Sequence, residues 1–212
     1  CRIKGRAGVG LLSALPVIDK RYGLPGLAED VDSGRWIEAD VKTPQGYTVT
    51  VVCVYVHAGN TDDPEKMKQK YRFLDTMLVR MGQLRDEAAH GGKQAVLCGD
   101  FNIAHTPLDI KNAKANEKHA GFLPEERAYV DKWLGELEFV DVMRSLCGDI
   151  QGPYTWWSQR GRAFDNNVGW RIDYQFATPE LAETARGFVI DKAPTYDLRW
   201  SDHAPLSITY DV

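Results

Sequence analysis

The run Gly99-Asp100-Phe101-Asn102 follows an apolar segment, residues 94–98, that has the composition of a buried strand. It places a carboxylate and a carboxamide two residues apart at the end of that strand. Because side chains alternate along an extended backbone, Asp100 and Asn102 are expected to point to the same side. Such a pair suits a site in which the amide holds a reacting oxygen and the carboxylate takes a proton or orders a metal-bound water. Asp and Asn also favour turns at strand ends, so the run taken alone is better explained as a structural Asx turn.

The surrounding pattern predicts an α/β fold with a mixed sheet arrangement, because strands alternate with helices and with hairpins. Apolar residues recur every three or four positions over 64–89, which predicts an amphipathic helix capped by Asp63. The early basic residues of this helix, Lys66, Lys68, Lys70 and Arg72, are expected on its solvated face. Further helices are expected over 124–137 and 179–184. Strands are expected over 7–15, 35–42, 47–56, 94–99, 171–177, 186–190 and 205–210.

Length and composition fit one large globular domain over residues 1–212, with 43% hydrophobic and 26% charged residues. The net charge of −4 argues against broad, nonspecific coating of nucleic acid, but it allows a local basic face around an acidic centre. No apolar run approaches the ~20 residues that span a bilayer, so no membrane association is expected. The four cysteines have no CxxC spacing, which favours buried thiols and a reducing, cytoplasmic location.

Three other segments place chemically useful side chains at or near strand ends. Tyr55 ends the strand that enters the loop at His57, Asp173 lies in a predicted strand, and Asp202-His203 precede the last strand. Taken singly, each has a structural explanation in aromatic packing, loop capping or a buried histidine. Together with the Gly99–Asn102 run they supply oxygen ligands for a hard cation such as Mg²⁺ and one group that titrates near neutrality. Phosphodiester hydrolysis requires this combination.

These residues lie within longer stretches that resemble the exonuclease III and class II AP (abasic-site) endonuclease branch of the endonuclease/exonuclease/phosphatase superfamily. The resemblance runs from about Gly5 to the C-terminus. It is strongest, in this order, over residues 99–112, 120–127, 154–174 and 201–205. It implies a four-layered α/β sandwich of two mixed β-sheets flanked by helices. It also implies a base excision repair phosphodiesterase that cleaves 5′ of abasic sites and removes 3′ blocking groups or nucleotides as a 3′-5′ exonuclease.

The resemblance implies a role for each catalytic position. Asp100 matches the residue that activates the attacking water, and Asn102 the residue that orients this water or contacts the phosphate. His203 matches the histidine that contacts a nonbridging phosphate oxygen, with Asp173 as its carboxylate partner. Tyr55 matches the tyrosine placed against the scissile phosphate. A neighbouring carboxylate raises an imidazole pKa, so the expected pair favours a cationic histidine against phosphate.

The same resemblance implies a metal ion and a DNA-binding surface. The metal is expected to be Mg²⁺, with Mn²⁺ as an alternative, and its ligands are Asp100, Asn102 and Asp202. Two tryptophans match the apolar walls of a pocket for an extruded abasic sugar, and polar residues interleave with them as on a DNA-facing loop. The expected substrate-binding residues are Asn116, Trp156, Arg160, Asn167 and Trp170. The partner is double-stranded DNA with abasic sites or 3′ ends, bound by a monomer.

One part of the family pattern is missing. The metal-binding Glu of the family, and an Asn near it, belong to a first strand–helix unit for which this sequence has no counterpart. We therefore expect an N-terminally incomplete domain that binds Mg²⁺ weakly on its own. Two alternatives remain open at this point. One is a phosphodiesterase for RNA or a small phosphoester, and the other is a non-catalytic DNA-binding remnant.

Overall fold

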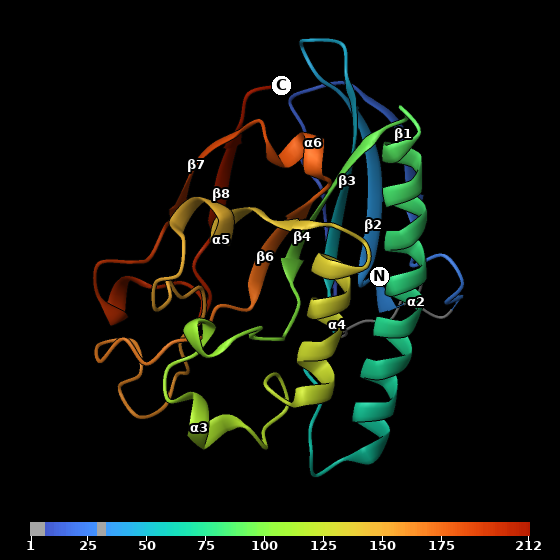
Figure 1. Ribbon diagram of the computed structural model, residues 1–212. Coiled ribbons are helices and arrows are strands. Elements are labelled where there is room, and N and C mark those ends of the chain that lie inside the picture. The colour runs from blue at the N-terminus through green and yellow to red at the C-terminus, as the bar shows by residue number, and fades with distance from the viewer. Residues whose placement is uncertain (1–6, 29–32) are drawn as a thin grey trace.

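The computed structural model describes residues 7–28 and 33–212 of the chain, and Figure 1 shows their arrangement. The described helices are α2 (Pro64–Ala89), α3 (Ala113–Asn116), α4 (Pro124–Gly135), α5 (Val142–Cys147) and α6 (Pro179–Ala182). Short 3₁₀ turns lie at Pro107–Asp109 and Tyr196–Leu198. The strands are β1 (Val17–Tyr22), β2 (Trp36–Lys42), β3 (Thr48–Tyr55), β4 (Gln94–Asp100), β5 (Val140–Asp141), β6 (Asp173–Ala177), β7 (Ala185–Ile190) and β8 (Leu206–Tyr210).

The strands form two sheets. The larger sheet has six strands in the order β1-β2-β3-β4-β6-β5, and β3 and β4 are its parallel pair. The other pairings in this sheet are antiparallel, so the sheet is mixed. The smaller sheet pairs β7 with β8 in the antiparallel sense. The α2 helix makes the crossover between the parallel strands β3 and β4, as a connection of this kind requires.

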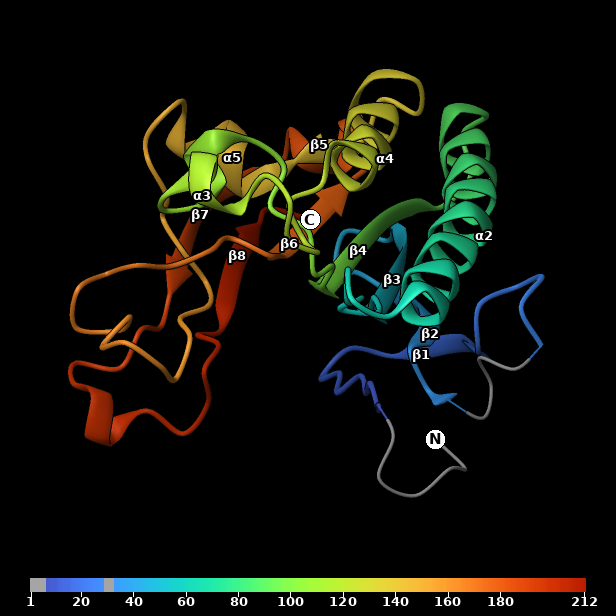
Figure 2. The ribbon, with the colours of Figure 1, turned by 90° about the horizontal axis from the view of Figure 1, so that it is seen from below.

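The two faces of the large sheet are covered differently (Figures 1 and 2). On one face, α2 and α4 pack on alternate residues of the central strands, including Val52, Val54 and Leu97. The intervening residues, such as Val49 and Val96, point to the other face and pack toward the β7–β8 pair. The alternation along β3 and β4 is what allows both faces to be buried. The expected α/β sandwich of sheets flanked by helices is confirmed.

Most of the predicted elements are present, with ends that shift by a few residues. The helix predicted over 64–89 is α2, and the Asp63 carboxylate accepts a hydrogen bond from the Lys66 amide at its first turn. The prediction of a strand over 7–15 is wrong, because the first described strand begins at Val17, beyond Pro16. Gly8 and Gly10 have no side chain and nothing lies within 4 Å of a Cβ at either position, so this segment has little to pack. Among the described residues, no helix is both long and apolar enough to cross a membrane.

Candidate active site

The ends of three adjacent strands bring the first candidate residues together. Tyr55 at the end of β3 pairs with Asp100 at the end of β4, and Asp100 pairs with Asp173 at the start of β6. Because β4 runs parallel to β3 and antiparallel to β6, two carboxyl ends and one amino end meet at the same edge of the sheet. The strand pairing therefore fixes these three residues side by side, at one edge of the sheet.

The Gly99–Asn102 run is a tight turn as well as part of the site. Gly99 has φ +142°, and a Cβ at this position would lie 1.9 Å from the Val54 carbonyl oxygen, so the backbone requires glycine. The Asn102 amide nitrogen of the backbone donates to Asp100 Oδ1 at 2.8 Å, which is an Asx turn. Asn102 Nδ2 donates to Asp100 Oδ2 and to the Val56 carbonyl, both at 2.9 Å. The structural interpretation of this run is thus confirmed, and the turn also presents Asp100 and Asn102 to a cavity; their catalytic roles stay a prediction.

His203 lies between the two carboxylates at the strand ends. Its Nδ1 is 2.9 Å from Asp173 Oδ2, and its Nε2 is 3.9 Å from Asp100 Oδ2. Burial lowers the pKa of His203, but the hydrogen bond and the charge of Asp173 outweigh this effect and raise it to about 9. Burial and repulsion from Asp173 raise the pKa of Asp100 to about 7. Near neutral pH the site therefore holds a cationic imidazole beside a carboxyl group that is poised to exchange a proton.

These groups open into a cavity of about 750 Å³. Asp173 lies outside it, hydrogen-bonded behind His203, and lines a smaller neighbouring hollow instead. Nine of the eleven candidate residues line this cavity, although they come from segments that are far apart in the sequence. They are Tyr55, Asp100, Asn102, Asn116, Trp156, Arg160, Trp170, Asp202 and His203.

Two tryptophans form an apolar wall of this cavity. Trp156 and Trp170 meet edge to face, with 6.0 Å between ring centroids and 86° between planes. Their backbones exchange hydrogen bonds, and Trp156 Nε1 donates to Asp202 Oδ2 at 3.0 Å. The neighbouring Trp157 is different, because it is buried in a small core with Phe164. Trp156 therefore links the apolar wall to the Asp202 carboxylate.

Asn167 is the predicted substrate-binding residue that the structure does not bring into the cavity. Its Oδ1 accepts a hydrogen bond from Trp157 Nε1 at 3.0 Å and lies 3.3 Å from Lys192 Nζ. The side chain thereby ties its own loop to the small core below it. A contact between this exposed loop and DNA stays a prediction.

Lys70 is a buried residue that the sequence pattern assigned wrongly to the solvated face of α2. Its side chain is fully buried and pairs with the Glu126 carboxylate of α4. Its Nζ also donates to the Asn102 carbonyl at 2.9 Å and to the Ala58 carbonyl at 3.1 Å. The spacing from Lys70 to Leu74 and Met77 puts all three on one helix face, and this spacing was the signal for its burial. Lys70 supports the Asn102 turn from behind.

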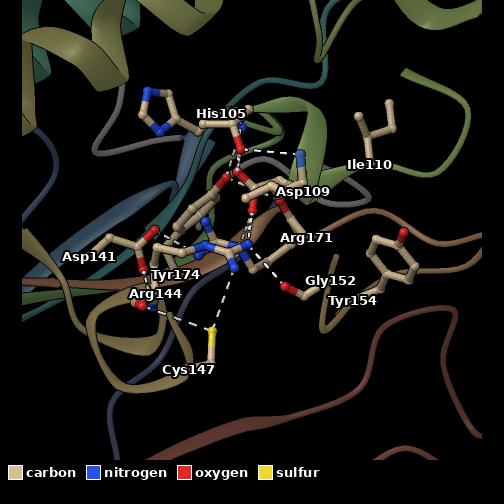
Figure 3. A network of polar contacts seen from close by, with 12 residues as sticks. His105, Asp109, Ile110, Asp141, Arg144, Cys147, Gly152, Tyr154, Arg171 and Tyr174 are labelled. Atoms are coloured by element: carbon tan, nitrogen blue, oxygen red, sulfur yellow. Dashed lines mark hydrogen bonds and ion pairs between the residues drawn. The ribbon is translucent and has the colours of Figure 1, made fainter. Parts of the chain in front are cut away.

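A second buried polar network supports the tryptophan wall (Figure 3). Arg171 is fully buried, and its Nε donates to Asp109 Oδ1 at 2.7 Å while its backbone amide donates to the Asp109 carbonyl. Its guanidinium also pairs with Asp141, and Arg144 reaches the same Asp109 carboxylate. Because Trp170 precedes Arg171, this network fixes the backbone from which the Trp170 ring projects. Neither Asp109 nor Arg171 was singled out from the sequence, since a buried ion pair has no local sequence signal.

The oxygen donors that face the cavity are of the kind that Mg²⁺ prefers. They are Asp100, Asn102 and Asp202. Within residues 7–28 and 33–212, no group of three or more His, Cys, Asp or Glu side chains is placed to hold a metal ion. Magnesium sites often use one or two carboxylates and leave the other positions to water and substrate phosphate. The raised pKa of Asp100 indicates negative charge that is incompletely compensated, which fits the approach of a cation.

An α/β sandwich that gathers carboxylates, an amide and a cationic imidazole at one sheet edge is the architecture of a hydrolase. Residues 1–203 match the model of the Endonuclease/Exonuclease/phosphatase family, and the chain belongs to this family. The resemblance inferred from the sequence motifs is therefore confirmed.

Several relatives and solved structures are similar to the chain. It is 32% identical to an exodeoxyribonuclease of Bacillus subtilis over 209 residues, which are 99% of this chain and 76% of that protein. It is 31% identical to a DNA-(apurinic or apyrimidinic site) endonuclease of Dictyostelium discoideum, of which it spans 54%. The structure of an AP endonuclease from Archaeoglobus fulgidus superposes with a TM-score of 0.81 at 31% identity, over 94% of this chain and 73% of that one. The similar proteins are thus nucleases of DNA.

Proposed function

We propose that this protein is a DNA repair phosphodiesterase that cleaves 5′ of abasic sites and removes 3′ blocking groups or nucleotides. The observation that carries the proposal is the Asp100–His203–Asp173 cluster, which faces a cavity walled by Trp156 and Trp170. The similarity to an exodeoxyribonuclease and to AP endonucleases supports the same class of substrate. The substrate is double-stranded DNA with an abasic site or a 3′ end.

Asp100 is placed to take the proton of the attacking water. Burial and the neighbouring Asp173 raise its pKa, which strengthens this carboxylate as a base, and a general base works best when it titrates near the working pH. Asn102 is placed to orient this water. Both N–H bonds of its amide are used, toward Asp100 Oδ2 and the Val56 carbonyl. Its Oδ1 is therefore the atom that remains to accept a hydrogen bond from the water.

His203 is placed to stabilise the phosphate. Its Nδ1 is held by Asp173, so the proton on Nε2 is directed toward the cavity. As a cation it donates a charge-assisted hydrogen bond to a nonbridging phosphate oxygen, on which negative charge grows in the transition state. Tyr55 lines the same cavity, with the Arg35 guanidinium 4.8 Å from the centre of its ring. We assign Tyr55 to the opposite flank of the scissile phosphate.

Mg²⁺, or Mn²⁺ in its place, would be held by Asp100, Asn102 and Asp202. When bound, it would offset charge on the phosphoryl oxygens. Trp156 and Trp170 would receive the extruded abasic sugar, and an apolar slot of this kind excludes an intact nucleotide. Asn116, Arg160 and Asn167 would contact the DNA around the slot.

The test is cleavage of a duplex with one abasic site by the full-length protein. We expect a metal-dependent nick 5′ of the site that Asp100→Asn and His203→Ala reduce by at least 100-fold, since general acid–base groups contribute about 10²–10⁴. Asp149→Asn is the control, because this carboxylate is exposed and lies outside the cavity. Unimpaired cleavage by both active-site variants would overturn the proposal.

The second candidate is a phosphodiesterase for RNA or a small phosphoester, which the same catalytic cluster could serve. Substitution of Trp156 and Trp170 by alanine distinguishes the two functions. If the substitutions abolish cleavage at abasic sites but leave cleavage of RNA or a small phosphoester intact, the DNA repair function is supported. If cleavage at abasic sites survives the substitutions, a function on RNA or a small phosphoester is favoured.

We also propose a monomer in the cytoplasm. The thiols of Cys53, Cys98 and Cys147 are free, which supports a reducing compartment. Analytical ultracentrifugation of the full-length protein, with and without DNA, tests the oligomeric state.

A further inference from the structure

Three loops that line the catalytic cavity meet over one buried ion pair. Ala58, Asn102 and Ala120 each line the cavity, and they belong to the loops after β3, after β4 and before α4. Lys70 of α2 and Glu126 of α4 form the ion pair, and neither side chain has any exposed surface. The pair is therefore placed to set the positions of the three loops relative to one another.

Lys70 joins the first two loops. An ammonium group has three N–H donors and no acceptor. Lys70 Nζ donates to the Ala58 carbonyl at 3.1 Å and to the Asn102 carbonyl at 2.9 Å, and its charge pairs with the Glu126 carboxylate. The two carbonyls belong to different loops, so one nitrogen atom fixes the separation between the loop after β3 and the catalytic turn, Gly99–Asn102.

Glu126 extends this link to the third loop. Its Oε1 pairs with Lys70, while its Oε2 accepts hydrogen bonds from the backbone amides of Gly121 and Leu123 at 2.6 and 3.0 Å. In turn, the Gly121 carbonyl accepts a hydrogen bond from the Ala104 amide at 2.8 Å. The loop before α4 is thus bound both to the ion pair and to the segment that follows the catalytic turn.

Gly121 brings the third loop against the tryptophan wall. Its φ is +93°, and a Cβ at this position would lie 3.0 Å from Cζ3 of Trp170 and 3.2 Å from the Asn102 carbonyl oxygen. The Gly121 backbone therefore fills the space between the catalytic turn and the wall, with little room for a side chain. A shift of this loop would change the separation between Asn102 and Trp170.

Stability alone does not account for an ion pair at this place. The cost of removing two charges from water roughly offsets their attraction, and an apolar pair of similar volume would join α2 to α4 as well. Hydrogen bonds, however, have strict requirements of distance and angle, whereas apolar contacts are non-directional. The pair therefore fixes the loops more narrowly than apolar packing would.

We infer that Lys70 and Glu126 are positioning residues for the reaction, which hold the catalytic turn at Asn102 in a fixed place relative to the Trp170 wall. The inference rests on the proposed function, because it takes the extruded sugar to lie against that wall. Neither side chain lines the cavity, and both act through the backbones of the loops. A misplacement of about 1 Å can slow a reaction about 100-fold. Loss of the pair should therefore lower kcat more than it weakens DNA binding.

The test compares turnover with stability in the double variant Lys70→Met/Glu126→Gln of the full-length protein. This variant removes the cation without leaving a buried charge, and its glutamine oxygen can still accept from the Gly121 amide. On a duplex with one abasic site, kcat should fall about 10-fold or more while KM stays within about threefold of wild type. Each variant is assayed under conditions where urea unfolding shows that it is folded.

Met77→Ala is the matched control, because it removes a buried side chain from the same face of α2 without removing a polar contact. It should lower stability and leave kcat within about twofold of wild type. Glu126→Gln alone is the second variant, since it presents an N–H group to Lys70 and breaks the pair. It should lower kcat in the same direction as the double variant.

Hydrogen exchange of the Ala104 amide tests the link without any cleavage, because this amide joins the catalytic turn to the Gly121 loop. Relative to the amides of β4, it should exchange about 10-fold faster in the double variant, and its relative rate should not change in Met77→Ala. Wild-type kcat or an unchanged relative rate in the double variant would overturn the positioning role. Failure of the wild-type protein to cleave the abasic duplex would contradict the proposed function, whereas faster exchange at Ala104 would still support the ion pair as the link.

Discussion

At the level of single residues, the pairing of His203 with Asp173 determines the charge of the site. The folded pKa of His203 is raised from 6.5 to about 9 because the hydrogen bond and charge of Asp173 overcome the effect of burial. The contribution of this pair to stability is therefore fully present below about pH 6.5 and is lost as the pH rises through about 9. The imidazole stays cationic over the whole physiological range.

Asp173→Asn should lower the pKa of His203 clearly below about 9, because the hydrogen bond and charge of Asp173 are lost and only the weaker effects of Asp100 and Asp202 still oppose burial. Two-dimensional NMR titration of the histidine ring protons measures this change directly. Asp131→Asn is the control, since Asp131 pairs with His105 and not with His203. A His203 pKa that stays near 9 in Asp173→Asn would show that another group holds the proton.

Gly99→Ala should destabilise the fold by roughly 3 kcal/mol or more, because a Cβ would lie 1.9 Å from the Val54 carbonyl and φ is +142°. Urea unfolding measures the change. Gly135→Ala in α4 is the matched control, since nothing lies within 4 Å of its Cβ position. It should be neutral or stabilise the protein by up to about 1 kcal/mol. Equal effects of the two substitutions would contradict the steric argument.

At the level of elements, the sequence predicts helices and strands better than it predicts their polar contacts. The bounds of α2 follow from the Asp63 cap and the apolar spacing, and both operate within a few residues of chain. The expected strand over 7–15 failed because a glycine-rich segment has few side chains to bury. The burial of Lys70 was missed, although its spacing from Leu74 and Met77 indicated the buried face, because a buried lysine needs a partner and this partner, Glu126, lies in another helix.

Lys70→Met should cost roughly 3–5 kcal/mol, because it leaves the Glu126 carboxylate buried without its cation. The double variant Lys70→Met/Glu126→Gln should recover part of this loss. The glutamine oxygen can still accept the hydrogen bonds from the Gly121 and Leu123 amides. A double-mutant cycle of urea unfolding free energies measures the coupling. Additive effects of the two substitutions would contradict a direct interaction between the side chains.

At the level of the whole molecule, a cluster of charges joins the edge of the large sheet to α2. Glu38 and Asp40 of β2 are buried, and Arg21 of β1 pairs with both of them. Arg80 of α2 pairs with Glu38, and Lys93 pairs with Asp40. Burial acts to raise the pKa of each carboxyl group, but the hydrogen bonds from these cations outweigh burial and lower both values.

Stability should therefore fall as the pH drops below about 4, where these carboxylates become protonated in the unfolded chain. Their contribution is present above the unfolded pKa values and is lost as the pH approaches the lower folded values. The free energy of unfolding in urea, measured from pH 7 to pH 3, should decrease, and Glu38→Gln should lessen its dependence on pH. Stability that is constant over this range in the wild-type protein would contradict the assignment.

The overall architecture and most of the site were predictable because the relevant motifs are short and lie at strand ends. Tyr55, Asp100 and Asp173 meet through backbone pairing of strands whose existence was predicted, although the order of these strands in the sheet was not. The charge cluster of β2 and the Asp109–Arg171 network were not predictable, because each joins segments that are distant in sequence.

The pairing of Tyr55 with Asp100, and of Asp100 with Asp173, has a consequence for how such a protein can diversify. Tyr55, Asp100 and Asp173 are fixed relative to one another by main-chain bonds between neighbouring strands. The tryptophan wall belongs to connecting segments instead, and segments of this kind tolerate exchange and insertion. Loops that line the cavity can thus be remodelled for new substrates while the carboxylates of the strand ends keep their places.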